Sequence, residues 1–267
     1  MGIPGVAKLR GIARFLLLSM LALGLGGCTL PTFGAFRGAT TQGRAEFQLW
    51  SGMTIAGLLV AVIVWGLILC AVIAYRRREP DKMPRQFHSN LPVEIIYTAV
   101  PLIIVGVIFF YTVRTENKID ALAAHPAVTI KVTGFQWGWS FSYLNSAGKQ
   151  IALVETAQTK PPVLAGNPTS PEYPQFVLPV GETTQIVLAS ADVVHGFYIP
   201  AFNFSRYALP GVTNYFDFTP VSTGVFAGHC AQYCGLYHAE MLFSVRVVTP
   251  SAFQAWLGSE SASGVAA

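Results

Sequence analysis

Charged residues are scarce in this sequence. Only 11% of its 267 residues are Asp, Glu, Lys or Arg, and 52% are apolar, whereas roughly 25% of the residues of an average soluble protein are charged. This imbalance indicates membrane-embedded segments. From Arg114 onward seven Lys or Arg residues stand against nine Asp or Glu, so the net positive charge belongs to the N-terminal part. Nucleic-acid binding is not indicated.

Two sequence patterns are absent. The chain has no internal repeat and no Cys-x-x-Cys-His motif, which excludes a covalently attached c-type haem on this chain. Cysteine itself is rare, with four residues. Cys70 lies within an apolar run, where we expect it to be ordinary packing, and Cys230 and Cys234 lie close together near the C-terminal end.

The N-terminus predicts export. Lys8, Arg10 and Arg14 precede a short apolar run, which is too short to span about 30 Å of hydrocarbon. A basic head, an apolar core and small residues are typical of an export signal. The ending Leu25-Gly-Gly-Cys28 resembles a bacterial lipoprotein box, in which Cys28 would be lipidated. The alternative is an ordinary signal peptide with an incidental cysteine.

Two long uncharged runs follow the leader. Residues 53–75 are almost continuously apolar and end at Arg76-Arg77-Arg78, a basic stretch typical of the cytoplasmic side. With Lys82 and Arg85 this stretch marks a cytoplasmic loop. The second run, residues 95–113, returns the chain outward, since each run is long enough to cross a bilayer. The sequence therefore predicts a transmembrane helical hairpin with both ends outside.

After Asp120 the apolar residues recur at every second position, as in half-buried strands. Residues 128–132 and 137–143 show this alternation, and residues 185–188 and 241–248 are further strand candidates. Repeated short strands separated by turn residues predict an all-β sandwich or barrel of the cupredoxin type. Residues 145–174 are polar and proline-rich, which predicts a long surface loop. The segment from Ser259 onward is predicted to be disordered.

The expected organisation has five parts. They are an export signal of the lipoprotein type (1–27), an N-terminal linker (28–48), a transmembrane hairpin (49–114), a cupredoxin-like domain (115–250) and a C-terminal tail (251–267).

The segment from His229 to Met241 gathers soft metal ligands. Cys230 and Cys234 lie four residues apart, His238 follows four residues later, and Met241 three after that. Thiolate, imidazole and thioether ligands suit copper, and two thiolates can bridge a pair of ions. His195 follows a strand-like run upstream and would complete the set. A two-copper electron-transfer centre is the favoured hypothesis.

Other interpretations of these residues are simpler. Two nearby cysteines in an exported domain commonly form a disulfide, and two Cys with two His could close a tetrahedral zinc site. A lone His or Met is usually a satisfied polar residue or part of the core. However, a disulfide would not need His238 or Met241, and zinc would not recruit a thioether.

These residues also carry a resemblance to a family. Asp192-Val-Val-His195, Pro210-Gly211 and Cys230-Ala-Gln-Tyr-Cys234-Gly-Leu-Tyr-His238-Ala-Glu-Met241 resemble subunit II of cytochrome c oxidase. The resemblance implies a dinuclear copper centre, CuA. Its expected ligands are His195, Cys230, the backbone carbonyl of Gln232, Cys234, His238 and Met241.

The resemblance also implies the function. Subunit II of a terminal haem-copper oxidase accepts electrons from cytochrome c and passes them to haem in subunit I, where oxygen is reduced to water, coupled to proton translocation. The implied partners are subunit I, other oxidase subunits, cytochrome c or a cytochrome c-bearing complex, and membrane lipid. The implied location is a bacterial plasma membrane, with the copper domain on the extracytoplasmic side.

Two further residues receive roles by the same resemblance. Trp137, in Phe135-Gln-Trp-Gly-Trp139, matches the tryptophan that takes electrons from cytochrome c, although an aromatic stripe on a strand is usually core. We expect Trp139 to be packing. Glu94 matches the glutamate at the mouth of the K proton pathway. The simpler account of Glu94 is a carboxylate that interacts favourably with a helix dipole.

The chain departs from the family pattern at several positions. Gln232 replaces a glutamate whose carboxylate binds a magnesium ion shared with subunit I, and a neutral amide is a weaker partner for a hard divalent cation. This departure weakens the expectation of magnesium. Ser205, Tyr207 and Val212 also differ from the usual residues, so contacts to subunit I are expected to differ there.

Three other functions share part of this pattern. A lipid-anchored copper carrier or assembly factor would bind copper without passing electrons, but two membrane spans and Trp137 argue against it. A quinol oxidase subunit II would lack the copper ligands. Nitrous oxide reductase would bring a large second domain, for which this chain is too short.

Overall fold

The computed structural model describes residues 32–76, 86–155, 169 and 173–264. The predicted export signal, the lipoprotein box with Cys28, and most of the predicted cytoplasmic loop, including Lys82 and Arg85, lie outside the described residues.

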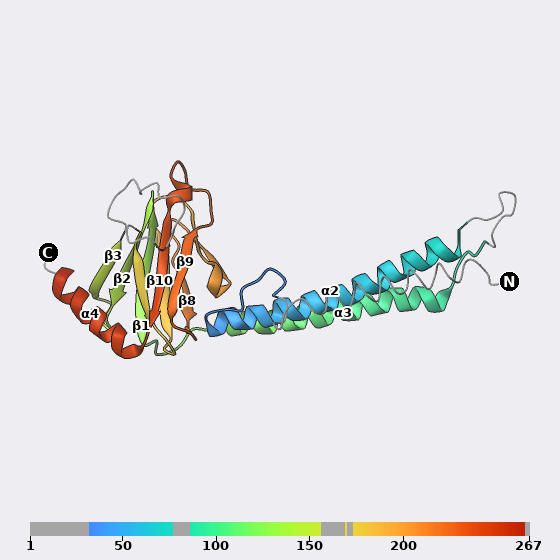
Figure 1. Cartoon of the computed structure of the whole chain (residues 1–267), viewed down its shortest axis with the longest axis horizontal. Coiled ribbons are helices and arrows are strands. Elements are labelled where there is room, and N and C mark those ends of the chain that lie inside the picture. Colours follow the sequence, from blue (N-terminus) through green and yellow to red (C-terminus); the bar gives the residue numbers. More distant parts are fainter. Residues whose placement is uncertain (1–31, 77–85, 156–168, 170–172, 265–267) are drawn as a thin grey trace, which may run out of the picture. The chain divides into compact units, whose positions relative to one another are not determined.

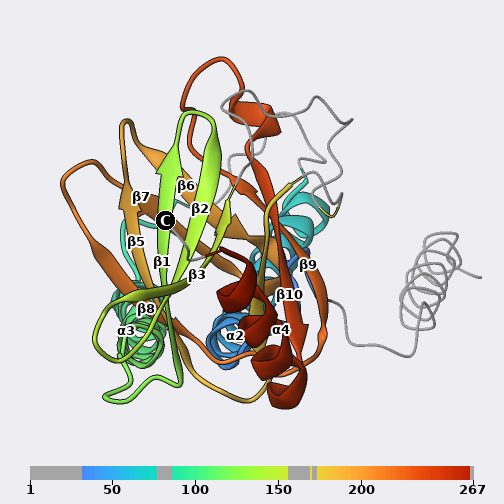
Figure 2. The ribbon, with the colours of Figure 1, turned by 90° about the vertical axis from the view of Figure 1, so that its left-hand side faces the viewer.

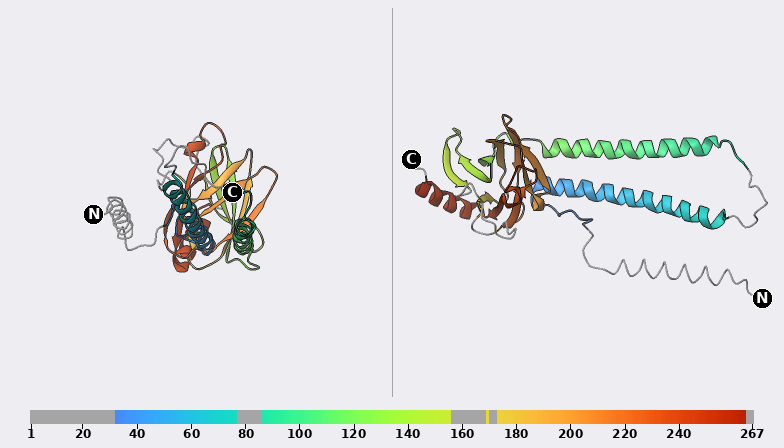
Figure 3. Two further views of the ribbon diagram at one scale, coloured as in Figure 1. Left: turned by 90° about the vertical axis from the view of Figure 1, so that its right-hand side faces the viewer. Right: turned by 90° about the horizontal axis from the view of Figure 1, so that it is seen from above.

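Two long helices run in opposite directions (Figures 1 and 3). They are α2 (Thr41–Ala74) and α3 (Leu91–Ile119), and both are long and apolar enough to cross a membrane. The Thr40 hydroxyl accepts a hydrogen bond from the Gly43 N–H at 2.9 Å, which caps α2 well before the first apolar run. Helix α2 therefore begins before the predicted hairpin of residues 49–114, and α3 ends after it.

The described residues that follow α3 form two facing five-stranded sheets (Figure 2). The first sheet has the order β3-β2-β1-β5-β8 and the second β4-β10-β9-β6-β7. The strands are β1 (Val128–Phe135), β2 (Gly138–Leu144), β3 (Gln150–Glu155), β4 (Gln175–Pro179), β5 (Thr184–Ser190), β6 (His195–Ile199), β7 (Phe204–Ala208), β8 (Asn214–Phe218), β9 (Gly224–Cys230) and β10 (Leu242–Val248). Three short elements complete the fold: the 3-10 helices η1 (Pro200–Phe202) and η2 (His238–Glu240), and the helix α4 (Pro250–Gly264).

Aromatic side chains fill the space between the sheets. Phe197 and Phe243 stack with ring centroids 4.9 Å apart, and Phe141 stacks on Phe176 at 4.5 Å. Trp139 is fully buried beside Phe197 and Phe243. The alternation expected along β1 and β2 is confirmed, because every second side chain there points into this core. The fold class predicted from the sequence, a helical hairpin followed by a β sandwich, is confirmed.

The prediction of one long surface loop over residues 145–174 is wrong in two places. Strand β3 lies within it and pairs with β2, with Ala152 opposite Tyr143 and fully buried. At the other end of the predicted loop, Tyr173 is also buried. The apolar run Ile151-Ala-Leu-Val154 is short and lies between polar residues, so its sequence did not predict a strand. In the folded protein it pairs with the edge of β2.

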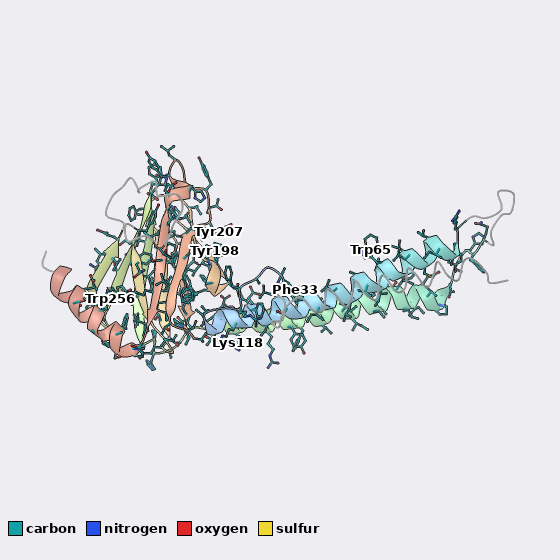
Figure 4. The ribbon with its side chains drawn as sticks, in the orientation of Figure 1. Phe33, Trp65, Lys118, Tyr198, Tyr207 and Trp256 are labelled. Carbon is teal, nitrogen blue, oxygen red and sulfur yellow. The ribbon has the colours of Figure 1, made fainter. Side chains whose placement is uncertain are left out.

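The prediction that residues from Ser259 onward are disordered is wrong as far as Gly264, where α4 ends. The helix is anchored upstream of that segment: Phe253 is 1% exposed, and Trp256, which is labelled on α4 in Figure 4, packs edge-on against Tyr143 at 5.0 Å. Tyr143 in turn donates its hydroxyl to the Val177 carbonyl at 2.9 Å. Tertiary packing of one face therefore stabilises a helix whose polar sequence would not predict it.

The start of α2 and the end of α3 contact the second sheet and the 3-10 helix η1 that follows β6. The Ala39 N–H donates to the Ala201 carbonyl at 2.8 Å, and a Cβ added to Gly43 would lie 2.1 Å from the Phe202 carbonyl oxygen. Only glycine permits this close approach of backbone to backbone. Arg206 on β7 also forms a 2.8 Å salt bridge with Asp120, which follows α3.

Candidate metal centre

One end of the second sheet collects the predicted metal ligands. Cys230 is the last residue of β9, and Cys234 lies in the loop that follows. His238 is the first residue of η2, and Met241 is the residue between η2 and β10. His195 is the first residue of β6, which pairs with β9 so that Phe197 lies opposite Cys230. The pairing of β6 with β9 brings the upstream histidine to the cysteine loop.

The six predicted ligands lie close together. The two Sγ atoms are 3.8 Å apart, and both cysteines are free thiols. The nearest ligand atoms of His195, Cys230 and Cys234 all lie within 4.8 Å of one another. The remaining contacts are Cys234 Sγ to His238 Nδ1 at 3.6 Å, Cys234 Sγ to Met241 Sδ at 3.8 Å, and Cys230 Sγ to the Gln232 carbonyl oxygen at 3.2 Å.

The His195 imidazole has one engaged and one unengaged nitrogen. Nε2 lies 2.9 Å from Asp192 Oδ1. Nδ1 is buried and has no hydrogen-bond partner among the described residues. A buried polar atom without a partner costs free energy, and a bound metal ion would satisfy it. A carboxylate on the far side of a ligand histidine is a common arrangement that holds the ring in place.

The two thiols differ in acidity. Burial alone would raise the pKa of Cys230, but the nearby His195 imidazole and the Gly196 N–H, which lies 3.4 Å from Sγ, lower it. Burial and the neighbouring Cys230 raise the pKa of Cys234 to about 12. Cys230 is therefore the more acidic thiol of the two, Cys234 stays protonated at neutral pH, and a cation would be needed to hold both as thiolates. Burial also lowers the pKa of His238, which favours the neutral imidazole that binds metals.

A hydrogen-bond network through Asp192 and Gln136 links the predicted ligands His195 and Cys234. Burial alone would raise the pKa of Asp192, but hydrogen bonds from His195 and from the amides of Gln136 and Val193 lower it. The Gln136 N–H donates to Asp192 Oδ2, and its side-chain Nε2 donates to the Cys234 carbonyl, both at 2.7 Å. His195 is thereby connected to Cys234 through the Asp192 carboxylate and through the backbone N–H and side chain of Gln136. Sequence reasoning assigned no role to Asp192 or Gln136, although Asp192 stands three residues before His195.

Glycines let the loop lie directly on β6. A Cβ on Gly196 would meet the backbone nitrogen of Gln232 at 2.7 Å, and the Ala231 N–H donates to the Gly196 carbonyl at 2.8 Å. Gly235 has φ = +117° and packs against Trp137, which favours glycine at that position. These glycines also carried no signal in the sequence, because their role depends on what packs against them.

The two tryptophans lie in different environments. Trp139 is fully buried, and its indole N–H donates to the Met241 carbonyl at 3.3 Å. Trp137 is partly exposed at the rim of the ligand loop, where its indole N–H donates to the Cys234 carbonyl at 3.1 Å. Tyr237 packs edge-on against Trp137 at 5.1 Å. The neighbouring loop residues Tyr233 and Leu236 are largely exposed.

Glu94 lies apart from this site, in the first turn of α3. Its carboxylate accepts a hydrogen bond from the Asn90 N–H at 2.9 Å. This contact is one half of a capping arrangement, in which the Asn90 side chain also accepts from the Val93 N–H.

Comparisons with known proteins show the family of the chain. Residues 128–248 match the family model described as the periplasmic domain of cytochrome c oxidase subunit II, and residues 38–115 match the model of its transmembrane domain. Cytochrome c oxidase subunit 2 of Mycobacterium tuberculosis is 36% identical over 303 residues, covering 96% of this chain and 84% of the relative. The probable cytochrome c oxidase subunit 2 of Streptomyces avermitilis is 38% identical over 254 residues, covering 85% of this chain and 80% of the relative.

A solved structure is also similar. The periplasmic domain of subunit II of cytochrome oxidase from Bradyrhizobium japonicum shares 32% identity, covers 53% of this chain and 99% of that chain, and gives a TM-score of 0.44.

Proposed function

This chain belongs to the family of cytochrome c oxidase subunit II, and we propose that it receives electrons from cytochrome c at a dinuclear copper centre in its β domain. The electrons then pass to haem in subunit I, where oxygen is reduced to water with coupled proton translocation. The observation that carries this proposal is the cluster of five soft or borderline side-chain ligands, together with the Gln232 carbonyl, at one end of the second sheet.

The residues that would hold the copper pair are His195, Cys230, Cys234, His238 and Met241, together with the Gln232 carbonyl. When bound, the pair supplies reversible one-electron chemistry. The protein holds these ligands on a packed sandwich: Trp139 fixes the Met241 carbonyl, and Asp192 orients His195. Ligands supported in this way move little when charge changes, which favours fast electron transfer.

Trp137 is the proposed point of electron entry. It is partly exposed, yet its indole N–H reaches the carbonyl of Cys234, a proposed copper ligand. A hydrogen bond therefore connects a surface aromatic ring to the centre. The exposed side chains of Tyr233 and Leu236 would contribute apolar contact area for the electron donor beside this ring.

Metal analysis of the purified oxidase complex tests the proposal. We expect two copper ions in this subunit and a visible absorption band in the oxidised state that disappears on reduction. One zinc ion per chain in place of copper, or copper without a redox-active band, would contradict the electron-transfer function.

Gln232 provides a test of the magnesium site. Because the copper bond would use the peptide carbonyl, Gln232→Glu should keep both copper ions. The added carboxylate should increase the affinity for magnesium or manganese by roughly tenfold or more, since hard divalent cations prefer charged oxygen ligands. Manganese electron paramagnetic resonance on the purified complex measures this affinity. A tightly held stoichiometric ion already present with Gln232 would show that other ligands suffice.

We further propose Glu94 as the entrance of the K proton pathway. Glu94→Gln keeps an oxygen that can accept from the Asn90 N–H but cannot release a proton, so the helix cap should survive while proton uptake slows by about tenfold or more. Stopped-flow measurement of proton uptake during reduction checks this result. Glu116→Gln, near the opposite end of α3, is the control, and equal slowing in both variants would remove Glu94 from the pathway.

The proposed topology places the β domain on the extracytoplasmic side of a bacterial plasma membrane. The basic run beginning at Arg76 supports this orientation, since such runs stay in the cytoplasm. We propose that residues 1–27 are removed and that Cys28 is lipidated. Mass spectrometry of the mature N-terminus would detect this lipid, and an unmodified N-terminus at another residue would contradict it.

A further inference from the structure

A groove of about 530 Å³ lies between α2 and α3 near their outer ends. Its apolar walls include Leu49 and Met53 from α2 and Val107 and Ile108 from α3. Its other end is polar and is lined by Tyr111, Arg114, Thr115 and Lys118. Figure 4 shows Lys118 extending from the outer end of the hairpin. One end of the groove is thus suited to hydrocarbon and the other to an anion.

The charges on the two sides of α3 are separated by sign. Arg114 and Lys118 are one helical turn apart and line this groove, which has no acidic residue in its lining. Glu116 and Asp120, also one turn apart, line a different hollow together with Glu46 and Arg206. Neither Arg114 nor Lys118 forms an ion pair with a described residue, whereas Asp120 pairs with Arg206. Two unpaired cations therefore stand beside the apolar groove.

We infer that this groove binds a phospholipid with an anionic headgroup. Arg114 directly follows the apolar run of α3, so the cations stand at the level of the lipid phosphates, where Tyr is also favoured. Arg binds phosphate with paired hydrogen bonds and Lys binds it as a point charge. From Val107 to Lys118 the helix rises roughly 16 Å, enough for a headgroup and the upper part of an acyl chain.

The apolar walls decide in favour of a lipid over free phosphate. An inorganic anion would leave the apolar side chains of Leu49, Met53, Val107 and Ile108 uncovered, whereas an acyl chain would contact them. The two-helix anchor is shown by the family match, and only the leaflet depends on the orientation proposed above. Failure to find copper in this subunit would therefore not affect this inference, and failure to find a bound lipid would not affect the copper proposal.

Gly52 allows the groove to be filled without strain. A Cβ added at Gly52, which lines the groove, would meet nothing within 4 Å. Gly52→Leu should therefore fold normally while its side chain occupies the space of the acyl chain. Gly66 on the same helix is equally open but does not line the groove. Gly66→Leu is the matched control.

The polar end has its own pair of variants. The double variant Arg114→Gln, Lys118→Gln removes both cations from the groove. Lys131→Gln with Lys149→Gln removes the same charge from exposed positions in the β domain. Since each basic residue near an anionic headgroup contributes roughly a fivefold factor in binding, we expect the first pair to weaken lipid binding about 25-fold and the second to leave it unchanged.

Native mass spectrometry of the complete purified oxidase complex, with dioleoylphosphatidylglycerol or dioleoylphosphatidylcholine added in detergent, tests the inference. We expect preferential retention of phosphatidylglycerol, lost in Gly52→Leu and weakened in the Arg114/Lys118 variant. Unchanged retention in both variants would overturn it. A photoreactive side chain at Met53 should label lipid, and labelling of another subunit or a second copy of this chain would show that protein covers the groove.

Discussion

Cys230→Ser and Cys234→Ser should each abolish the two-copper centre while the β domain stays folded. A serine hydroxyl is not ionised near neutral pH and is a hard ligand, so it replaces neither the charge nor the softness of a thiolate. With one thiolate left, the two ions cannot be bridged as a pair. We expect copper to fall from two ions per chain to one or none and the mixed-valence signal of the oxidised state to disappear.

Copper analysis with electron paramagnetic resonance on the purified complex measures both quantities. Cys70→Ser is the matched control, because Cys70 is an exposed thiol near the C-terminal end of α2 and outside the proposed copper site. The control should keep both copper ions and the full signal. Retention of the mixed-valence signal in either loop variant, or a Cys230–Cys234 disulfide in the active complex, would refute the two-thiolate bridge.

Trp137→Ala should slow electron entry without changing the copper centre. The indole ring is partly exposed, and it contacts the loop through its N–H bond to the Cys234 carbonyl and through packing against Gly235 and Tyr237. Gln136 donates to the same carbonyl at 2.7 Å, so the loop keeps a support when the indole is removed. Truncating a Trp at the centre of an interface costs about 2 kcal/mol or more, so the second-order rate should fall roughly thirtyfold or more.

Stopped-flow oxidation of reduced cytochrome c measures this rate, and the absorption spectrum of the oxidised complex reports on the copper centre. Trp256→Ala removes an equally large side chain from α4, whose contacts are with Tyr143 and Phe253, and should leave the rate unchanged. If Trp137→Ala instead bleaches the copper band, the indole supports the ligand loop and is not the entry point.

Several features of this protein could be predicted from local sequence because each depends on a pattern within one segment. Two uncharged apolar runs predict two membrane-crossing helices whatever the rest of the chain does. The alternation along β1 and β2 predicts their buried faces. The ligand types between Cys230 and Met241 already indicate copper, since softness belongs to the side chains themselves.

The sequence by itself determined the hairpin, the sandwich class and the chemical types of the proposed copper ligands, because these follow from residue type and short-range period. Only the tertiary structure decided where β3 and α4 form, since β3 depends on pairing with β2 and α4 depends on Trp256 packing against Tyr143, far earlier in the chain. It likewise decided that Asp192 and Gln136 join His195 to Cys234. A hydrogen bond such as the one from Gln136 to Cys234, 98 positions apart, leaves no local pattern, because only folding brings its atoms within bonding distance.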